Sequence, residues 1–523
     1  MPQAANPGAG RAGYDYIIVG AGASGSVIAG ELSKTGAEIL VIESGPDDRA
    51  PTIGDPSIWF YNVGSPLDFG LAVKPAPQLG GRAFNMALGH VLGGGSAINA
   101  MVWSRGMARD YDGWGEHGAK GWAFEDVLPM FKAQEDWEGG ASEWRGVGGP
   151  IHIRLPRDPH PTARAVLEAA EQMGLPILGD MNGPMRDGAG FINMNIAADG
   201  TRVSAAKGFL HPNLSRANLT LLLNTAVTKV VFDGDRASGV EIADGDGVRR
   251  LSAAREVILA AGTIHTAQLL MLSGVGEASA LTRLGIAPVA DLHGVGRNLQ
   301  DHVHVSGVVS RYKGKFPDRP AGSNAVEAEV NLSSGVDGHD TDILLVLEQL
   351  PNASAELAGR YGALPENCFT ISPSLIQPTS RGQVSLTSAD WRDPPTIDLN
   401  LLGTDRDLAA TLRAVEAGRE LLSQRAFDAI REAELIPGAK AASRQDLINF
   451  VRMGALSFGH PTGTARMGTD ADAVVDGELR VHGVRGLRVA DASVMPSVIS
   501  GATNAPSIMI GGRGAEFIRS DIG

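Results

Sequence analysis

The sequence predicts an α/β protein of two domains: one with a parallel sheet and crossover helices, the other α+β with a mainly antiparallel sheet. Three observations predict this. Residues 14–43 read as strand, glycine-rich turn, helix and second strand, in that order. Short alternating segments follow one another between residues 305 and 402. The chain has 523 residues, more than one core usually supports.

The first predicted element is an N-terminal strand that runs into a glycine-rich turn. The apolar run 14–19 ends at Gly20, which permits the tight turn out of the strand. Gly22 lets main chain approach a pyrophosphate, and Gly25 lets a helix over residues 23–34 pack closely on the sheet. This spacing predicts a Rossmann-like dinucleotide site, with the helix N-terminus facing the phosphates.

A second strand over residues 38–42 ends at an acidic residue. Glu43 stands at about the spacing expected of a carboxylate that accepts hydrogen bonds from a ribose hydroxyl. An ordinary βαβ unit without a nucleotide is the alternative. Because strand, glycines, helix, second strand and acid all occur in order, the nucleotide site is favoured.

Two further glycine-rich blocks follow. Residues 89–103 contain Gly93, Gly94 and Gly95 in succession, which lets main chain lie flat against a planar ligand and direct N–H groups at its acceptors. The block over residues 262–276 follows an apolar strand at residues 256–261, so strand, glycine and helix recur in that order.

The central part of the chain predicts the second domain. The segment 155–163, rich in proline and charge, indicates a crossing between domains. Apolar residues at helical spacing over 405–423 predict a helix that covers a sheet. The strands expected in that mainly antiparallel sheet are residues 326–332, 343–347, 368–376 and 383–387.

Charge and cysteine content exclude several classes of protein. With 45 basic and 59 acidic residues the net charge is −14, which argues against a nucleic-acid partner or an anionic membrane surface. Cys368 is the only cysteine, so neither an intrachain disulfide nor a thiolate metal cluster can form. The first thirteen residues lack the apolar core of a signal peptide, and no apolar stretch is long enough to span a bilayer. We therefore expect a cytoplasmic protein with no membrane segment and no metal.

Together the glycine-rich blocks resemble those of the glucose–methanol–choline (GMC) oxidoreductase family. The first family signature matches from residue 89 to 112, with His90 where the family usually carries Arg, Lys or Asn. The second matches over 262–276, with Ala267 where Pro or Ser is usual. Further matching segments extend the resemblance over essentially the whole chain; they are residues 294–302, 380–382 and 489–493.

The resemblance implies FAD as the cofactor and an FAD-binding domain assembled from separate segments. These segments are expected to be residues 1–154, 201–302 and 470–523. The substrate-binding domain then comprises residues 155–200 and 303–469.

The same comparison implies a set of FAD-binding residues. Residues 99–102 would run beside the isoalloxazine, Val227 would meet the adenine, and Asp491 would contact the ribityl–pyrophosphate region. The full set is Gly20, Gly22, Ala23, Ser24, Gly25, Glu43, Ser44, Gly94, Asn99, Ala100, Met101, Val102, Val227, Asp491, Ala492 and Ala505.

The resemblance also implies that FAD is bound without a covalent link. In choline-oxidising relatives a histidine attaches FAD, and Ile98 stands at about that position here. His90 is expected to replace an arginine near the FAD phosphates or neighbouring main chain.

Removal of hydride from an alcohol carbon requires a neutral base within hydrogen-bond reach of the hydroxyl. Of the 12 histidines, His460 lies in a segment that resembles the family's H-x-x-G-T sequence, which implies that it is the catalytic base. Asn504 stands where the family places a second His or Asn, and its amide can donate a hydrogen bond to the alcohol oxygen. A helix N-cap role for Asn504 is compatible with this. A helix beginning at Ser507 would direct its N-terminus at the flavin pyrimidine ring.

The predicted function is FAD-dependent oxidation of a primary alcohol to the aldehyde, with proton abstraction by His460 and hydride transfer to flavin N5. The substrate classes implied are aromatic or furanic alcohols, pyridoxine, polyols, sugars and polyethylene glycols. Residues 59–61 and the strand over 369–376 are expected to shape the pocket. The partner is thus a small-molecule alcohol, while the electron acceptor and the oligomeric state stay open.

Three alternatives remain. A light-driven decarboxylase on this fold is disfavoured, because relatives of that kind use an active-site cysteine and the sequence does not place Cys368 near the flavin. A lyase of the cyanohydrin-cleaving type shares this fold and also uses a histidine base. A binding-only role is disfavoured because His460 and Asn504 occupy both matching positions.

Overall fold

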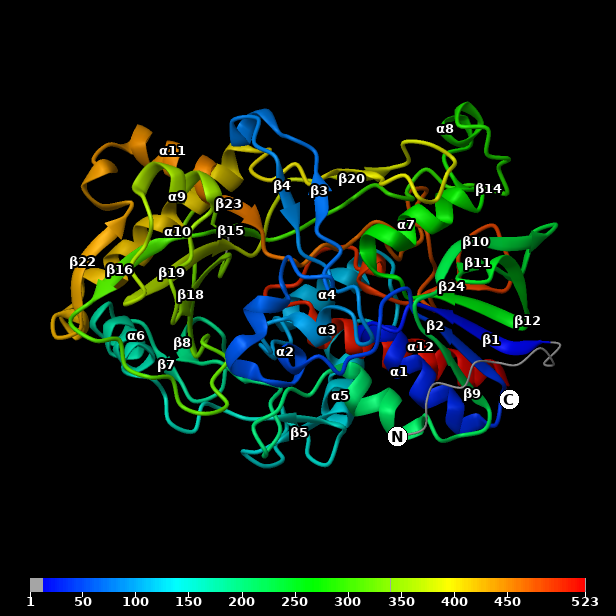
Figure 1. Cartoon of the computed structure of the whole chain (residues 1–523), viewed down its shortest axis with the longest axis horizontal. Coiled ribbons are helices and arrows are strands. Elements are labelled where there is room, and N and C mark those ends of the chain that lie inside the picture. Colours follow the sequence, from blue (N-terminus) through cyan, green and yellow to red (C-terminus); the bar gives the residue numbers. More distant parts are fainter. Residues whose placement is uncertain (1–12, 339, 523) are drawn as a thin grey trace.

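Two large sheets lie at opposite ends of the molecule, the seven-stranded one at the right of Figure 1 and the nine-stranded one at the left. The computed structural model describes residues 13–338 and 340–522. Residues 1–12 lie outside the described residues. They belong to the first predicted segment of the FAD-binding domain and to the stretch that was examined for a signal peptide.

The seven-stranded sheet has a parallel part, and the predicted N-terminal strand lies at its centre. Tyr16 to Val19 pair in parallel register with Ile39 to Ile42 on one side and with Glu256 to Leu259 on the other. The parallel order is β24 (Leu487–Val489), β12 (Gly247–Leu259), β1 (Tyr14–Val19), β2 (Ile39–Ile42) and β9 (Leu219–Leu222). The predicted strand–helix–strand unit is therefore confirmed, since α1 (Ala23–Leu32) connects β1 to β2.

Strand β12 belongs to two pairings at once. Its first half pairs with β11 (Arg236–Asp244), which pairs with β10 (Ala226–Asp233), in an antiparallel meander. Its second half joins the parallel part beside β1. The strand expected over residues 256–261 is thus the end of a thirteen-residue strand, and α7 (Gly262–Leu272) follows it as predicted.

The nine-stranded sheet is antiparallel except at one edge, where two short strands pair in parallel. This confirms the predicted mainly antiparallel sheet. Its main path is β22 (Arg431–Ile436), β16 (Val308–Tyr312), β19 (Cys368–Leu375), β18 (Ile343–Glu348), β17 (Ala328–Leu332), β8 (Gly188–Phe191) and β7 (Ile177–Leu178). Off this path, β15 (Val303–Val305) pairs with β19 and with β23 (Ala455–Ser457).

The helix predicted over 405–423 is α10 (Asp405–Ser423), and it packs on β19 and β18. Thr404 caps it by accepting the N–H of Asp407. The strand expected at residues 383–387 is placed wrongly by the prediction. It is β20 (Gln383–Ser385), which forms a separate ribbon with β21 (Thr396–Asp398) and contacts α7, not the large sheet. Alternation predicts a strand here but not its partner.

The remaining elements connect or cover the two sheets. Three further two-stranded ribbons are β3 (Leu71–Val73) with β4 (Phe84–Met86), β5 (Glu135–Trp137) with β6 (Ile151–Ile153), and β13 (Val275–Gly276) with β14 (Ala290–Asp291). The other α-helices of seven or more residues among those described are α4 (Ala108–Glu116), α5 (Phe124–Gln134), α6 (Pro161–Gln172), α9 (Ala355–Tyr361), α11 (Arg444–Gly454) and α12 (Asn504–Ile522).

Helices α1 and α12, from opposite ends of the chain, pack against each other (Figure 1). Gly511 makes the close approach possible, since a Cβ there would lie 2.6 Å from the carbonyl oxygen of Ser24. The Ser24 hydroxyl donates to the carbonyl of Ser507 at 2.7 Å. The helix expected from Ser507 begins three residues earlier, at Asn504, so the C-terminal helix contributes directly to the glycine-loop side of the molecule.

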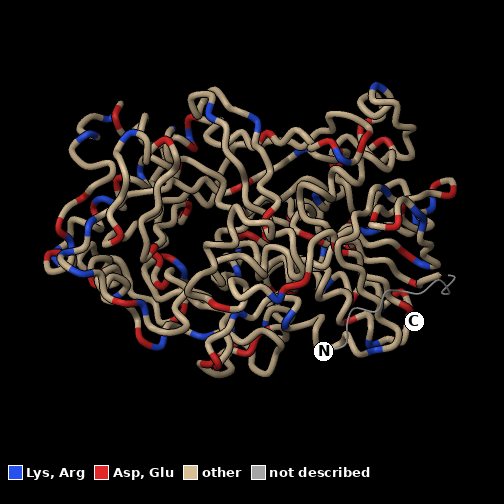
Figure 2. Tube along the Cα trace, viewed as in Figure 1, with Lys and Arg blue, Asp and Glu red and all other residues tan. Residues whose placement is uncertain are grey.

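Basic and acidic residues are interspersed along the chain trace (Figure 2). Among the described residues, no helix combines the length and apolar character needed to cross a bilayer.

Candidate active site

A cavity of about 1250 Å³ is lined by residues from both sheets. One end is formed by the glycine-rich turn after β1, the start of α7 and strand β10. The other end is formed by side chains of β17 and β18 together with the turn that carries His460. The cavity therefore joins the expected cofactor region to the expected substrate region.

Most of the residues expected to bind FAD lie on the wall of this cavity. Gly25, Met101 and Ala505 do not line it. Met101, at a positive φ of 58°, is buried in a small apolar cluster with Ile192 and Met194. The residues that line it are Gly20, Gly22, Ala23, Ser24, Glu43, Ser44, Gly94, Asn99, Ala100, Val102, Val227, Asp491 and Ala492.

Two glycines hold main chain close together at the cofactor end. A Cβ on Gly25 would lie 2.0 Å from the carbonyl oxygen of Gly20, so only glycine lets α1 approach the turn. Gly94 has a φ of +54°, and a Cβ there would lie 2.8 Å from the Cα of Gly22. The first and second glycine-rich blocks are thus in direct main-chain contact.

Glu43 lies at the end of β2 and braces the glycine turn. Its carboxylate accepts the N–H of Ala21 at 2.9 Å and that of Gly45 at 2.8 Å. Burial raises its pKa, and these hydrogen bonds oppose the rise. The carboxylate still faces the cavity, where a ribose hydroxyl could donate to it.

Asp491 links the C-terminal segment to α7. Its carboxylate accepts the N–H of Gly262, at 2.9 Å, and the hydroxyl of Thr266, at 2.6 Å. Burial raises its pKa. Asp491 therefore fixes the first turn of α7 against the cavity wall.

These features fit FAD. Gly22 and Gly94 approach each other closely and carry no side chains, so the main chain of the first turn faces the cavity directly. The N-terminus of α1 suits a pyrophosphate, and Glu43 suits a ribose. Val227 and its neighbour Ala226 line the far end, where an adenine would lie.

His460 and His302 face each other at the other end of the cavity. Their Nδ1 atoms lie 2.9 Å apart, and the Nε2 of His302 lies 3.0 Å from the carbonyl oxygen of Ile499. A carbonyl oxygen can only accept, so His302 carries its proton on Nε2 and its Nδ1 accepts. His460 must then carry its proton on Nδ1, which leaves the lone pair of its Nε2 free.

Burial keeps both imidazoles neutral. It lowers the pKa of His302 to about 4 and that of His460 well below its ordinary value. His302 and His304 lower the pKa of His460 further. His460 is therefore an uncharged imidazole, the form that can accept a proton.

Asp301 holds the turn that carries His460. Its Oδ1 accepts the backbone N–H of His460 at 3.0 Å, and its Oδ2 accepts the hydroxyl of Ser457. Burial raises its pKa to about 7. Asp301 thus positions the main chain of the predicted base.

Asn504 also lines the cavity, at the first turn of α12. Its Nδ2 is buried and has no hydrogen-bond partner among the described residues. A buried amide N–H without a partner is costly, and a ligand oxygen would satisfy it.

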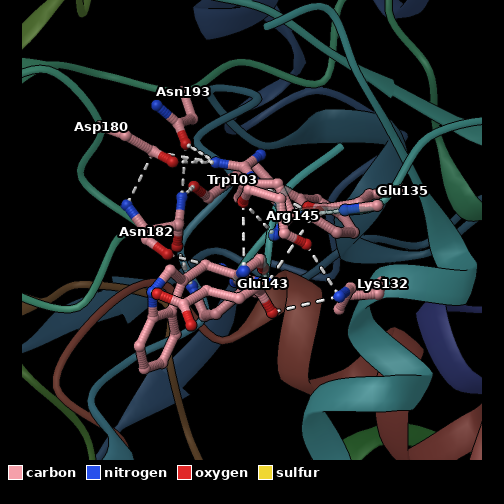
Figure 3. A network of polar contacts seen from close by, with 12 residues as sticks. Trp103, Lys132, Glu135, Glu143, Arg145, Asp180, Asn182 and Asn193 are labelled. Atoms are coloured by element: carbon pink, nitrogen blue, oxygen red, sulfur yellow. Dashed lines mark hydrogen bonds and ion pairs between the residues drawn. The ribbon is translucent and has the colours of Figure 1, made fainter. Parts of the chain in front are cut away.

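A buried polar network includes Trp103, which directly follows residues 99–102 (Figure 3). Arg145 donates to Glu135 at 3.0 Å and to Asp180 at 2.8 Å. Trp103 donates its indole N–H to Glu135, and its carbonyl accepts the amide of Asn182 at 2.9 Å. Figure 3 shows these side chains converging on one region, so the network fixes the chain at Trp103, the end of the second glycine-rich block.

The substrate end differs from the expected one. Of residues 59–61 only Trp59 lines the cavity, with its indole N–H donated to the carbonyl of Asn324 at 2.8 Å, while Tyr61 is 64% exposed. The expectation for the strand over 369–376 is wrong, because no residue of β19 lines the cavity and residues of β18 do. Alternation cannot tell which strand of a sheet borders a ligand.

Several cavity-lining residues were not singled out from the sequence. They are Arg186, His265, His302, His304, Glu329 and Glu348. For His302 and His304 a signal exists, since alternate residues of extended chain share a face; His304 lies in β15 and His302 directly precedes it. For Glu348 the signal is weaker. It follows the apolar Leu344 by four residues and Val346 by two, so the three side chains share one face of β18.

Aromatic rings border the cavity near its cofactor end. The rings of His90 and Phe69 stack with centroids 4.2 Å apart, and Phe69 lies 4.4 Å from the ring of His265. Burial lowers the pKa of His90 and lowers that of His265 to about 4.

Comparison with known proteins finds relatives of one family that match nearly the whole chain. Family sequence models described as GMC oxidoreductase match residues 14–304 and 378–511. An oxygen-dependent choline dehydrogenase of Brucella anthropi is 38% identical over 96% of this chain and 95% of its own length. Human mitochondrial choline dehydrogenase is 36% identical over 97% of this chain and 90% of its own length.

The solved structures include a pyridoxine 4-oxidase from Mesorbium loti. It superposes with a TM-score of 0.91 at 31% identity and covers 97% of this chain and 99% of its own. The matched length, the two glycine-rich blocks and the FAD-compatible cavity agree. The chain belongs to the GMC oxidoreductase family, and it is an FAD-dependent oxidoreductase that acts on CH–OH donors.

Proposed function

We propose that the protein oxidises a primary alcohol to the aldehyde, with His460 as the base and Asn504 as the group that orients the alcohol oxygen. The observation that carries this is the tautomer of His460. Its Nδ1–H is donated to His302, which in turn donates to the carbonyl of Ile499. The free Nε2 of a neutral imidazole is the atom that can take the hydroxyl proton.

The residues divide the work between proton transfer and orientation. His460 removes the hydroxyl proton at Nε2, and His302 fixes the orientation of its ring. The unpartnered Nδ2 of Asn504 donates to the developing alkoxide and holds the carbinol in one pose. FAD, when bound, supplies the hydride acceptor for the carbinol carbon.

The named relatives support a primary alcohol as the substrate class. Choline and pyridoxine each carry a primary alcohol, and they name two of the enzymes to which this chain is similar. Aromatic or furanic alcohols, polyols and sugars complete the panel to be tested. The electron acceptor is oxygen or another oxidant.

The test is anaerobic mixing of the purified FAD-loaded protein with a panel of primary alcohols, while the absorption of oxidised flavin is followed. Bleaching by one class of alcohol, with formation of the aldehyde, is the expected result. Readmission of air then separates an oxidase from a dehydrogenase. Aldehyde release from a cyanohydrin without bleaching would contradict the proposal and indicate a lyase.

A further inference from the structure

We propose that Arg202 is a positioning residue for the cofactor, which orients the amide of Asn99 and places a positive charge behind it that favours reduced FAD over oxidised FAD. This rests on the proposed function, because hydride transfer from the carbinol adds a negative charge to the flavin ring. Arg202 does not line the cavity and Asn99 does, so Arg202 acts through Asn99.

The first observation is that the charge of Arg202 is buried without a counterion. Arg105, Arg202 and Arg488 are among the largest side chains that are almost wholly buried. Arg105 lies 3.7 Å from Glu135, and Arg488 lies 2.7 Å from Glu256. Arg202 forms no ion pair with a carboxylate of the described residues. A buried charge is costly unless a charge of opposite sign lies near it.

The guanidinium of Arg202 keeps its charge at neutral pH. Burial lowers its pKa to about 9, and no neighbouring carboxylate opposes that shift. Its Nη2 is buried and has no hydrogen-bond partner among the described residues. A negative charge on a ligand in the adjacent cavity would offset part of the cost of burying this cation.

The second observation is how the guanidinium is held. Its Nε donates to the carbonyl of Ile53 at 2.8 Å, and its Nη1 donates to that of Ser96 at 3.3 Å. These carbonyls belong to the short helices α2 (Pro51–Gly54) and α3 (Gly95–Ile98). The last carbonyls of a helix lack partners within it, and an arginine can satisfy them. The protein alone therefore fixes the position of the charge.

The third observation is the orientation that Arg202 imposes on Asn99. Its Nη1 lies 2.7 Å from Oδ1 of Asn99, and the backbone N–H of Met101 donates to the same oxygen at 3.0 Å. A guanidinium can only donate, so the atom that it meets must be the amide oxygen. The Nδ2 of Asn99 makes no hydrogen bond to the described residues, and it is the amide atom left for a ligand in the cavity.

Asn99 lies between the two ends of the cavity. Gly94, five residues earlier, is in main-chain contact with the first glycine turn, which suits the pyrophosphate. Val102, three residues later, packs on the same apolar cluster as Phe458, whose ring lies 4.8 Å from that of His460. The flavin ring has to reach from the pyrophosphate to a carbinol at His460. Asn99 therefore stands beside the part of the cavity that the flavin occupies.

An amide donor with a positive charge behind it stabilises negative charge on a ligand more than it stabilises a neutral ring. When the carbinol carbon gives its hydride to flavin N5, both electrons of the broken C–H bond enter the ring, and the hydroxyl proton goes to His460. The reduced ring is then more negative by one charge. Arg202 should therefore raise the reduction potential of the bound flavin.

The experiment measures the flavin without any alcohol. Sulfite adds through sulfur to N5 of oxidised flavin and leaves a negative charge on the ring, so its dissociation constant reports how well that charge is stabilised. Sulfite binding and the two-electron reduction potential are measured for FAD-loaded wild type and three variants, Arg202→Gln, Arg202→Lys and Arg157→Gln.

The variants separate charge from hydrogen bonding. Arg202→Gln keeps an N–H donor for the oxygen of Asn99 and loses the charge, whereas Arg202→Lys keeps the charge. Arg157 is 55% exposed and lies outside the cavity lining, so Arg157→Gln controls for the loss of one positive charge from the protein.

We expect Arg202→Gln to bind sulfite at least tenfold more weakly than wild type. Its reduction equilibrium should shift against the reduced flavin by the same factor, which is about 30 mV for a two-electron couple. Arg202→Lys and Arg157→Gln should stay within threefold of wild type in both measurements. In Arg202→Gln the dissociation constant of oxidised FAD should change less than that of sulfite, because the oxidised ring is neutral.

Unchanged sulfite affinity and reduction potential in Arg202→Gln would overturn the proposal. Equal losses in Arg202→Gln and Arg202→Lys would also overturn it, since the side chain would then act by its shape and not by its charge. If the Arg202 variants hold no flavin, Asn99→Leu provides the test, because it leaves Arg202 in place. It should weaken sulfite binding threefold or more, and wild-type affinity in this variant would contradict the role of the pair.

The outcomes also separate this proposal from the proposed function. Flavin that binds sulfite as expected, but that no alcohol bleaches, would overturn alcohol oxidation and leave the role of Arg202 in stabilising negative charge on the ring. Bleaching by an alcohol in a protein whose Arg202→Gln variant has the wild-type potential would do the reverse.

Discussion

The carboxylate of Asp301 accepts the backbone N–H of His460 at 3.0 Å, so a buried acid holds the main chain from which the proposed base projects. The pKa of Asp301 is raised to about 7 by burial, and its ionisation therefore falls in the working pH range. Above that pH its negative charge favours proton uptake by His460.

Asp301→Asn should remove the pH dependence that the ionisation of Asp301 gives to proton uptake by His460. We expect kcat to fall about tenfold and the rise of kcat with pH near 7 to disappear, with FAD still bound. The pH profile of kcat for one alcohol tests this, and Asp301→Glu should restore part of the profile. If Asp301→Asn lowered kcat equally at every pH, Asp301 would be structural only.

His460→Ala should abolish proton abstraction while the cofactor end of the cavity stays intact. Loss of a general base costs about a hundredfold to ten-thousandfold in rate. The rate of anaerobic flavin reduction by an alcohol gives the value, and the flavin spectrum provides the control. A near-normal rate in this variant would rule out His460 as the base.

Asn504→Ala should lower the rate of anaerobic flavin reduction by an alcohol by about a hundredfold, because one donor to the developing alkoxide is lost. The loss should appear in kcat, since the hydrogen bond is strongest at the transition state. A change confined to KM would show that Asn504 only binds the alcohol.

Acid should destabilise the protein between pH 6.5 and about 4. His265, His302 and His304 each have a pKa lowered to about 4 from the ordinary 6.5, so the unfolded chain takes up protons first. The stabilisation is complete above pH 6.5 and is lost as pH falls through the folded-state pKa. Each shift corresponds to on the order of 3 kcal/mol.

Thermal unfolding at a series of pH values measures this loss of stability in acid. His304→Gln should flatten the acid limb, whereas the matched change at the exposed His117 should leave it as in wild type. An unaltered acid limb in His304→Gln would show that the pKa of His304 is not lowered in the folded protein.

Gly25→Ala should lower FAD content, because the added Cβ would meet the carbonyl oxygen of Gly20 at 2.0 Å. Gly113→Ala, where nothing lies within 4 Å of the added atom, is the matched control. The ratio of flavin to protein absorption measures both. Acid precipitation of wild type should leave the yellow colour in solution, as expected for FAD that is not attached through His90.

The sequence predicts the cofactor half of the molecule better than the substrate half. At the cofactor end, close main-chain contacts require glycine at positions such as Gly25 and Gly94. The spacing of these glycines can be recognised in the sequence. At the substrate end, alternation correctly predicts the strand over residues 343–347, which in the structure extends to Glu348. The partner strands and the face toward the cavity depend on long-range packing. Residues such as His302 gain their role only from a neighbour 158 positions away.

The cofactor half also has a consequence for biosynthesis. Strand β24 and helix α12 complete the sheet and the cavity wall that β1 and α1 begin, and Ser507 of α12 is synthesised 483 residues after Ser24 of α1. Until those segments have been synthesised, the glycine turn lacks Asp491 and Asn504, which line the same cavity. The FAD site can therefore be complete only after both segments are present, and a nascent chain interrupted between them would carry an incomplete sheet.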